Sequence, residues 1–303
     1  MKTEALNLKT LTKQFLVIAF LLSVAATAIA QSPNPQRDSQ TSDDDRAEAL
    51  VAKGLQLDNL GSYVEAVDAF RSAATFSPGD WRIHHNLGVA LARLKRYDEA
   101  VSALTQAITL MPNSAISRYN LGTVYAELGR NSDALAEFGR TIQIDPHYND
   151  AHRGLCKTNI ALNQLQHAVA CYENWTRLGS LDADSLGEYG YALKGTKQHE
   201  KAITILQKAS ILSPDNATVL NVLGVAFIDK KQYDQAVAIL RRAVELEPDY
   251  EMARYNLVVA QIALKNRPAA LEQYAFLRQS NSNLAQQVYA IMFRKKLLVI
   301  KPE

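Results

Sequence analysis

The chain has 303 residues, an ordinary apolar fraction of 48%, and 33 basic against 31 acidic side chains. A formal charge of +2 does not supply the net basic surface that nucleic acids or anionic membranes require, so neither is an expected partner. The length suffices for one large domain or two ordinary ones.

The first 30 residues are typical of a cleaved secretory signal. Three lysines form a positive leader, an apolar run follows from Phe15 to about Ala26, and small residues precede a cleavage point near Ala30. The apolar run is shorter than the roughly 20 residues of a membrane-spanning helix. We therefore expect export to the periplasm or the exterior, with a retained membrane anchor as the alternative. Cleavage would remove three lysines and one glutamate and leave 30 basic and 30 acidic residues.

Residues 31–45 form the next segment and contain few apolar side chains. Pro33, Pro35 and the acidic run Asp43–Asp45 stand among serines and glutamines. A segment of this composition cannot bury enough apolar surface to offset the entropy that is lost on folding. We expect a disordered linker here.

From residue 46 to residue 284 the sequence repeats with a period of 34 residues. Prolines near the end of most units set the register: Pro78, Pro112, Pro146, Pro214 and Pro248. This register divides the segment, without any insertion, into seven units: 47–80, 81–114, 115–148, 149–182, 183–216, 217–250 and 251–284. The eighth position is glycine in five units, the twentieth is alanine in all seven, and the twenty-fourth is always large and apolar.

This pattern resembles the tetratricopeptide repeat. The resemblance implies an all-α fold, a right-handed solenoid of helix hairpins, with a C-terminal capping helix and tail over residues 285–303. Positions 4, 7, 8 and 11 share one face of the first helix, and positions 20, 24 and 27 share one face of the second. Small residues at positions 8 and 20 allow the two helices to approach closely, and neighbouring hairpins must stack to bury their apolar faces.

Unit four departs from this pattern. It has Cys156 in place of glycine, Asn159 at an apolar position, Trp175 at a small position, and no terminal proline. We predict a packing irregularity or a bend between residues 175 and 190. Ordinary drift of the repeat pattern is the alternative, because consensus residues bias the packing of helices without fixing it.

The two cysteines of the chain, Cys156 and Cys171, occupy the eighth and twenty-third positions of unit four. These positions lie level in an antiparallel hairpin, as the seventh and twenty-fourth positions do. An exported protein folds in an oxidising compartment. We predict a disulfide that joins the two helices of the unit, with two small buried thiols as the alternative.

No motif for catalysis or metal binding accompanies the repeats in the sequence. The six histidines form no zinc-ligand pattern, and neither a phosphate-binding loop nor a nucleophile elbow occurs. We therefore expect no enzyme, no metal site, no cofactor and no small-molecule substrate. The expected partner is a protein or a peptide.

The resemblance also implies that first helices line a concave groove, with positions 2, 5, 6, 9, 12 and 13 facing the partner. Asparagine, aromatic or basic side chains at the fifth and sixth positions are the candidate partner-binding residues: His85, Asn86, Tyr119, Asn120, Arg153, Asn221, Tyr255 and Asn256. An amide suits a peptide backbone because it both donates and accepts hydrogen bonds. The Asn-Leu-Gly element is similar to the repeats of O-linked N-acetylglucosamine transferase, in which stacked asparagines hold an extended peptide. Local hydrogen bonds of these asparagines are the alternative.

We expect a non-catalytic scaffold or adaptor of the bacterial periplasm that binds an extended segment of a partner in this groove. Two further interpretations remain, a structural assembly factor of a bacterial envelope complex and a non-catalytic subunit of an enzyme complex. All three follow from the mode of binding that a helical solenoid offers, and none identifies the partner.

Overall fold

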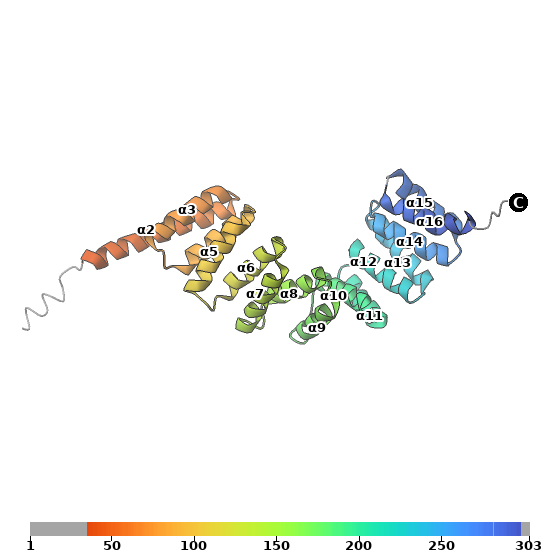
Figure 1. Ribbon diagram of the computed structural model, residues 1–303, viewed down its shortest axis with the longest axis horizontal. Helices are drawn as coiled ribbons and strands as arrows, with labels where there is room; N and C mark the ends of the chain where they lie inside the picture. Colours follow the sequence, from red (N-terminus) through yellow and green to blue (C-terminus); the bar gives the residue numbers. More distant parts are fainter. Residues whose placement is uncertain (1–34, 281, 298–303) are drawn as a thin grey trace, which may run out of the picture. The chain divides into compact units, whose positions relative to one another are not determined.

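The computed structural model describes residues 35–280 and 282–297. Every regular element in this part of the chain is an α-helix, so the predicted all-α fold is confirmed (Figure 1). The predicted signal, residues 1–30, and the tail beyond residue 297 lie outside the described residues. None of the helices described is long and apolar enough to cross a membrane.

The described chain forms two compact units, one that ends at Leu110 and one that begins at Met111. The first contains four helices: α2 (Pro35–Asn59), α3 (Tyr63–Phe76), α4 (Trp81–Arg93) and α5 (Tyr97–Leu110). The second contains eleven helices: α6 (Ala115–Glu127), α7 (Asn131–Ile144), α8 (Asn149–Ala161), α9 (Leu165–Thr176), α10 (Ala183–Gly195), α11 (His199–Leu212), α12 (Ala217–Asp229), α13 (Tyr233–Leu246), α14 (Glu251–Ala263), α15 (Arg267–Gln279) and α16 (Asn283–Leu297).

The helix starts coincide with the repeat register. Helices α4, α6, α8, α10, α12 and α14 begin at residues 81, 115, 149, 183, 217 and 251, where the sequence places the starts of units two to seven. Each of these first helices is followed by a second helix that packs against it, and the next first helix packs against that second one within each compact unit. The chain is therefore a helical-repeat solenoid in which each hairpin buries its apolar face against its neighbours.

The packing of position 8 against position 24 explains the glycines of the register. A Cβ atom on Gly190 would lie 2.4 Å from Cγ of Leu206, and one on Gly224 would lie 2.4 Å from Cγ of Leu240. A side chain at either glycine would force the two helices of its hairpin apart. The alanines at position 20 are fully buried in every unit: Ala66, Ala100, Ala134, Ala168, Ala202, Ala236 and Ala270.

The predicted disordered linker, residues 31–45, is wrong over residues 35–45, which are helical and belong to α2. Ser77 Oγ donates a hydrogen bond of 2.7 Å to Asp44 Oδ1, and the guanidinium of Arg46 lies 5.8 Å from the ring centroid of Phe76. Composition indicates only that the segment is unstructured when it is isolated. In the folded protein these contacts with Ser77 and Phe76 hold the end of the segment against the end of α3. Adding turns to an existing helix is also easier than nucleating a new one.

Unit four differs from its neighbours within the range that the sequence marks as irregular. Helix α9 ends after 12 residues, whereas α7 and α11 each have 14, and the connection to α10 is correspondingly longer. Trp175 is only 4% exposed and occupies the site that alanine fills in several other units. A side chain of this size needs more space between helices, and the longer connection, residues 177–182, accommodates the difference.

Helix α16 covers the C-terminal end of the second unit, where the sequence places a capping helix. It packs against α14 and α15. Val288 is fully buried and Met292 is nearly so, in a cluster with Val258 and Leu277. The helix thus buries the apolar face that the last hairpin would otherwise leave exposed.

Candidate functional site

Three successive first helices of the second unit, α8, α10 and α12, line a groove of about 490 Å³. The side chains that determine its chemistry are Arg153, Lys157, Asp184, Glu188, Tyr191 and Val222. Gly187 also lines this groove, and a Cβ atom on it would lie 2.9 Å from Cγ2 of Val219. Glycine at this position therefore lets α10 approach α12 closely.

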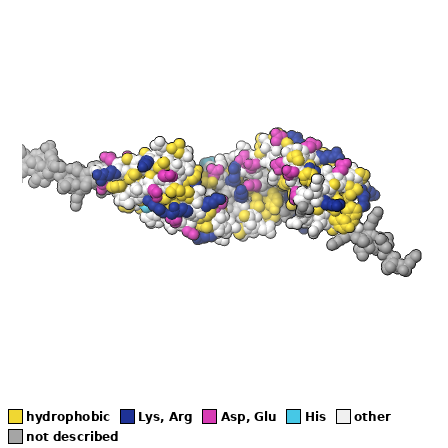
Figure 2. Space-filling view, turned by 90° about the horizontal axis from the view of Figure 1, so that it is seen from above, with side chains coloured by type: hydrophobic (Ala, Val, Ile, Leu, Met, Phe, Trp, Pro, Cys, Tyr) yellow, Lys and Arg dark blue, Asp and Glu magenta, His cyan; other side chains and the backbone are white. Residues whose placement is uncertain are grey.

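The walls of the groove carry charges of opposite sign. The cations Arg153 and Lys157 come from α8, where a spacing of four residues places them on one face of the helix. The carboxylates Asp184 and Glu188 come from α10 and share one face of that helix, because they are also four residues apart. Tyr191 is 43% exposed, and Lys194 Nζ lies 5.6 Å from its ring centroid. Figure 2 shows that the face of the chain in view carries both basic and acidic side chains.

An ion pair with Asp182 holds Arg153 at the edge of the groove. Asp182 is the N-cap of α10, and its Oδ1 accepts a hydrogen bond of 2.8 Å from the backbone nitrogen of Ser185. Burial alone would raise the pKa of Asp182, but the hydrogen bonds from Ser185 and the charge of Arg153 lower it below its ordinary value. The ion pair therefore persists at neutral pH and connects α8 to the start of α10. Within the described chain, Lys157 forms no such pair.

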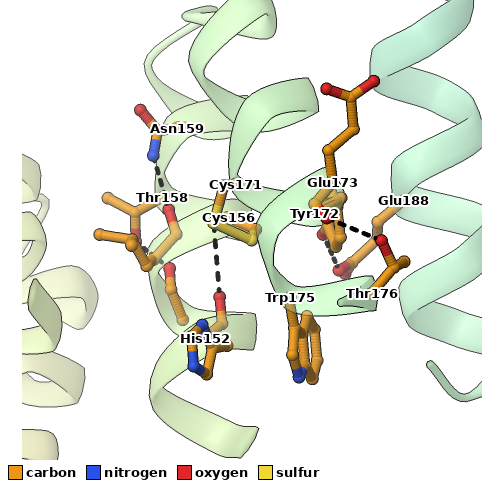
Figure 3. The surroundings of a disulfide bond; sticks show 12 residues. His152, Cys156, Thr158, Asn159, Cys171, Tyr172, Glu173, Trp175, Thr176 and Glu188 are labelled. Atoms are coloured by element: carbon orange, nitrogen blue, oxygen red, sulfur yellow. Dashed lines mark hydrogen bonds between the residues drawn. A yellow bond between two sulfur atoms is a disulfide. The ribbon is translucent and has the colours of Figure 1, made fainter. Parts of the chain in front are cut away.

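Glu188 is positioned by a buried tyrosine of α9. The hydroxyl of Tyr172, which is fully buried, donates a hydrogen bond of 2.7 Å to Glu188 Oε2 (Figure 3). Burial, followed by the charge of Glu188, raises the pKa of the Tyr172 hydroxyl. The hydroxyl therefore keeps its proton and, as the hydrogen-bond donor, orients the side chain of Glu188 on the wall of the groove.

A disulfide between Cys156 and Cys171 joins α8 to α9, and it is the pair that the sequence predicts (Figure 3). The Cα atoms are 5.4 Å apart, and Cys156 is fully buried. The sulfur of Cys171 lies 3.9 Å from the carbonyl oxygen of His152. Because a disulfide sulfur carries no hydrogen, this is a packing contact and not a hydrogen bond.

Stacked aromatic rings continue the packing from the disulfide towards α10. The ring of His152 stacks on Trp175 with centroids 5.8 Å apart, and Tyr172 stacks on Tyr189 at 5.4 Å. The indole nitrogen of Trp175 donates a hydrogen bond of 3.0 Å to Asn149 Oδ1. This cluster connects α8, α9 and α10, and so it fixes the two charged walls of the groove relative to each other.

A second pocket, of about 410 Å³, lies on the other side of α8 and is lined by residues of α6, α7 and α8. Tyr119 and Thr123 come from α6, and Arg153 and Lys157 again come from α8. The ring of Tyr119 lies between Phe138 at 5.9 Å and Tyr148 at 5.1 Å. Since Arg153 and Lys157 line both pockets, the two form one continuous surface across the first helices α6, α8, α10 and α12, which we call the central groove.

The first compact unit has a separate groove of about 850 Å³ between α2 and α4, which we call the N-terminal groove. Val51, Leu55 and Ile83 form its apolar floor, and Asp44 and Glu48 lie on its rim. Asp80 and Arg82 also line it, but they form an ion pair with each other. This groove therefore combines an apolar floor with a negative rim.

The structure distributes the eight predicted partner-binding residues over several places. Asn86 lines the N-terminal groove, and Tyr119 and Arg153 line the central groove. His85 is only 9% exposed and lies 6.0 Å from the Trp81 ring, and burial lowers its pKa. It is packed in the first unit, so its ring is poorly placed to contact a partner.

The C-terminal members of the predicted set interact with each other or with the core. Asn221 is 7% exposed; its Nδ2 donates to the Tyr250 hydroxyl at 3.3 Å, and its Oδ1 accepts from Asn256 Nδ2 at 2.8 Å. Tyr255 packs against the apolar cluster beneath the capping helix. Asn120 is partly exposed but lines neither the central groove nor the N-terminal groove. The amides of Asn221 and Asn256 thus link consecutive repeats.

The sequence prediction selected asparagine, aromatic and basic side chains at the fifth and sixth positions, and it missed most residues of the central groove. Asp184, Glu188 and Tyr191 occupy the second, sixth and ninth positions of unit five, and Lys157 occupies the ninth position of unit four. These are positions that the family resemblance already directs to the groove. The position of a residue within the repeat therefore predicted groove residues better than its residue type did.

Comparison with known families agrees with this architecture. Two family descriptions, each of the tetratricopeptide repeat, match residues 81–146, 193–245 and 227–290 and together cover more than half of the chain. Comparison with curated proteins gives no match.

Solved structures with the same fold include a tetratricopeptide-repeat protein from Parabacteroides merdae, with a TM-score of 0.61, 15% identity, and coverage of 80% of this chain and 99% of that one. The C-terminal part of a repeat-containing protein from Cytophaga hutchinsonii has a TM-score of 0.61 at 16% identity, with coverage of 83% and 100%. YrrB, described as a TPR protein with an unusual peptide-binding site, has a TM-score of 0.55 at 20% identity, with coverage of 62% and 96%. The repeat register, the helix hairpins and the family matches together establish that this chain belongs to the tetratricopeptide-repeat family.

Proposed function

We propose that this chain is a non-catalytic protein-interaction scaffold that binds an extended segment of a partner polypeptide along the central groove. The observation that supports this is the continuity of the surface, because Arg153 and Lys157 line both of its pockets. Proteins of this repeat family generally act as interaction scaffolds, and a groove across successive first helices suits an extended segment.

The charges of the walls define the chemistry of the segment. Lys157 has no ion pair in the described chain and favours an acidic side chain of the partner on the α8 side. Asp184 and Glu188 favour a basic side chain on the α10 side. Tyr191 and Val222 offer an apolar contact surface between them, and an exposed tyrosine is a frequent source of binding energy in interfaces. The expected segment therefore carries an acidic residue, an apolar anchor and a basic residue.

Peptide display on the purified chain tests this proposal, because a random peptide library requires no identified partner. The wild type should select peptides in which acidic, apolar and basic residues recur at fixed spacing. A Lys157→Glu, Tyr191→Ala variant should bind the selected peptides at least about tenfold more weakly, a difference of about 1.4 kcal/mol. The matched control is Lys208→Glu, Ile211→Ala, which makes the same kinds of change at exposed positions of the second helix α11.

The outcomes separate the candidate functions. Equal loss in both variants, or a selected motif unchanged by Lys157→Glu, would contradict binding in the central groove. Cross-linking and mass spectrometry of the tagged full chain in a bacterial host would then show whether partners remain bound to the groove variant. Partners that remain bound in a stable, membrane-associated complex would favour a structural assembly role in the envelope, or a subunit of an enzyme complex, over an adaptor.

We also propose that the chain is exported to the periplasm after cleavage near Ala30. The leader pattern of residues 1–30 and a disulfide in the folded part support this, since disulfides persist in oxidising compartments. Mass spectrometry of the protein from a periplasmic fraction should give an N-terminus at or near Gln31. Recovery of the intact N-terminus from the membrane fraction would instead favour a retained anchor.

A further inference from the structure

We propose that the N-terminal groove binds the C-terminal helix α16 of a second copy of this chain, so that copies associate head to tail. This site lies apart from the central groove and is independent of the function proposed for it. The first observation is the shape and chemistry of the groove. It has a volume of about 850 Å³, Leu55 in its floor is 43% exposed, and Asp44 and Glu48 stand on its rim.

The charge of the groove follows from the helix that forms its wall. Helix α2 contains six acidic and three basic residues. Of the two rim carboxylates, Asp44 accepts a hydrogen bond from Ser77, whereas Glu48 interacts with the charge of Arg82 but forms no hydrogen bond or ion pair within the described chain. Asp80 is neutralised by Arg82. The rim therefore has unbalanced negative charge beside exposed apolar surface.

The last helix of the chain has the complementary character. Helix α16 contains three basic residues, consecutive in sequence at Arg294, Lys295 and Lys296, and no acidic residue. One face packs on α14 and α15, yet Tyr289 is 46% exposed and Ile291 is 41% exposed. A helix with exposed apolar side chains and a basic end matches a groove with an apolar floor and an acidic rim.

The two surfaces lie on the first and the last helix of the described chain, and they differ from each other. An interface between unlike surfaces of identical chains is heterologous, and every assembly that has not closed into a ring keeps one unoccupied groove and one unoccupied helix. Association should therefore continue beyond the dimer as the protein concentration rises. Because opposite charges contribute, added salt should weaken it.

Sedimentation velocity on the full chain, purified from a bacterial host, measures this directly. The wild type should grow from monomer through dimer to larger species with concentration, and salt raised to about 1 M, where the Debye length falls to about 3 Å, should shift it towards monomer. A wild type that stays monomeric throughout the accessible concentration range would overturn the proposal.

A mixing experiment with two one-sided variants assigns the surfaces. The groove variant is Glu48→Lys, Leu55→Lys, and the helix variant is Tyr289→Asp, Ile291→Asp. All four positions are exposed, so both variants should fold, and circular dichroism checks this. Each alone should need at least tenfold higher concentration than the wild type to associate. Mixed in equal amounts, they should form a heterodimer and nothing larger, because each retains one intact surface.

Two further variants keep the test decisive. Lys295→Glu, Lys296→Glu changes only the charge of α16 and should weaken association as the helix variant does. The central-groove variant Lys157→Glu, Tyr191→Ala should associate like the wild type. All variants have the same sequence before α2, so any contribution of that segment to association would appear equally in each. Variants that all associate like the wild type, or a mixture that stays monomeric, would overturn the proposal.

Discussion

The hydroxyl of Tyr172 donates a hydrogen bond of 2.7 Å to Glu188, so a fully buried residue of α9 orients a carboxylate on the wall formed by α10. The same tyrosine ring stacks on Tyr189 and lies next to the disulfide-linked Cys171 in the chain. The conformation of the central groove therefore depends on the interior of unit four, which is the unit that departs most from the repeat pattern.

Replacement of Tyr172 by phenylalanine removes this hydrogen bond and leaves the ring in place. We expect the free energy of unfolding to fall by about 0.5–1.5 kcal/mol, because Glu188 loses a partner while it remains partly buried. Urea unfolding followed by circular dichroism measures the change. Tyr191→Phe is the matched control, since its hydroxyl has no hydrogen bond within the described chain. Equal effects of the two substitutions would contradict the role assigned to the Tyr172 hydroxyl.

Reduction of the Cys156–Cys171 disulfide should destabilise the protein. The bond closes a loop of 15 residues, for which the chain-entropy estimate is about 3 kcal/mol. Urea unfolding with and without reductant tests this, and a Cys156→Ala, Cys171→Ala variant should not respond to the reductant. Alkylation of the unreduced protein from its native host, followed by mass spectrometry, should find no modified cysteine. Two alkylated thiols would mean that the bridge is absent in the cell.

The repeat pattern and the structure make opposite predictions for Trp175→Ala. Alanine is the residue of the repeat pattern at this position in several units, which suggests a stabilising change. In the structure Trp175 is 4% exposed, stacks on His152 and donates a hydrogen bond to Asn149, so we expect a loss of about 3–5 kcal/mol. Leu178→Ala, at a position 45% exposed, should stay within about 0.5 kcal/mol of the wild type. A Trp175→Ala variant that is more stable than the wild type would contradict the stabilising role that these contacts assign to Trp175.

Two glycine-to-alanine substitutions should have opposite signs. Alanine at Gly190 would bring its Cβ to 2.4 Å from Leu206, which is fully buried, and overpacking of this kind usually costs about 1–3 kcal/mol. Gly139 lies within helix α7 and has no neighbouring atom within 4 Å of a Cβ, so alanine should stabilise the helix there by up to about 1 kcal/mol. Thermal unfolding of the two variants distinguishes these effects, and destabilisation by both would contradict the argument.

The first compact unit should lose stability as the pH falls below about 6.5, the ordinary pKa of histidine. Burial lowers the pKa of His85 in the folded chain, so the unfolded chain takes up a proton first and is favoured in acid. The loss should approach about 1.4 kcal/mol per pH unit until the folded pKa is reached. Hydrogen exchange of the α4 amides between pH 7 and pH 5, corrected for intrinsic exchange rates, should show this loss of stability in the wild type. The loss should be much smaller in a His85→Gln variant.

The sequence alone was sufficient for the fold, the register and one covalent contact. Glycine at position 8 and alanine at position 20 recur because two helices of one hairpin must approach closely, and this requirement is local to each unit. Cys156 and Cys171 could be paired for the same reason, since both belong to one hairpin whose geometry the repeat specifies. Such contacts lie within about 20 residues of sequence, where helix periodicity determines which side chains face each other.

Only the tertiary structure decided how these hairpins share their surfaces. Position within a repeat directs a side chain towards the groove, but the adjoining repeats determine whether it stays accessible. Asn221 is covered and bonded to Asn256 of the next unit, whereas Lys157 and Tyr191 remain open to a partner. Residues 35–45 are helical, and Asp44 at the end of this range and the neighbouring Arg46 contact Ser77 and Phe76, which composition does not reveal. Whether a side chain is buried or hydrogen-bonded between repeats depends on residues about 34 positions away in the sequence. The periodic pattern predicts the direction in which a side chain points, but it does not predict which side chain of the adjoining repeat lies next to it.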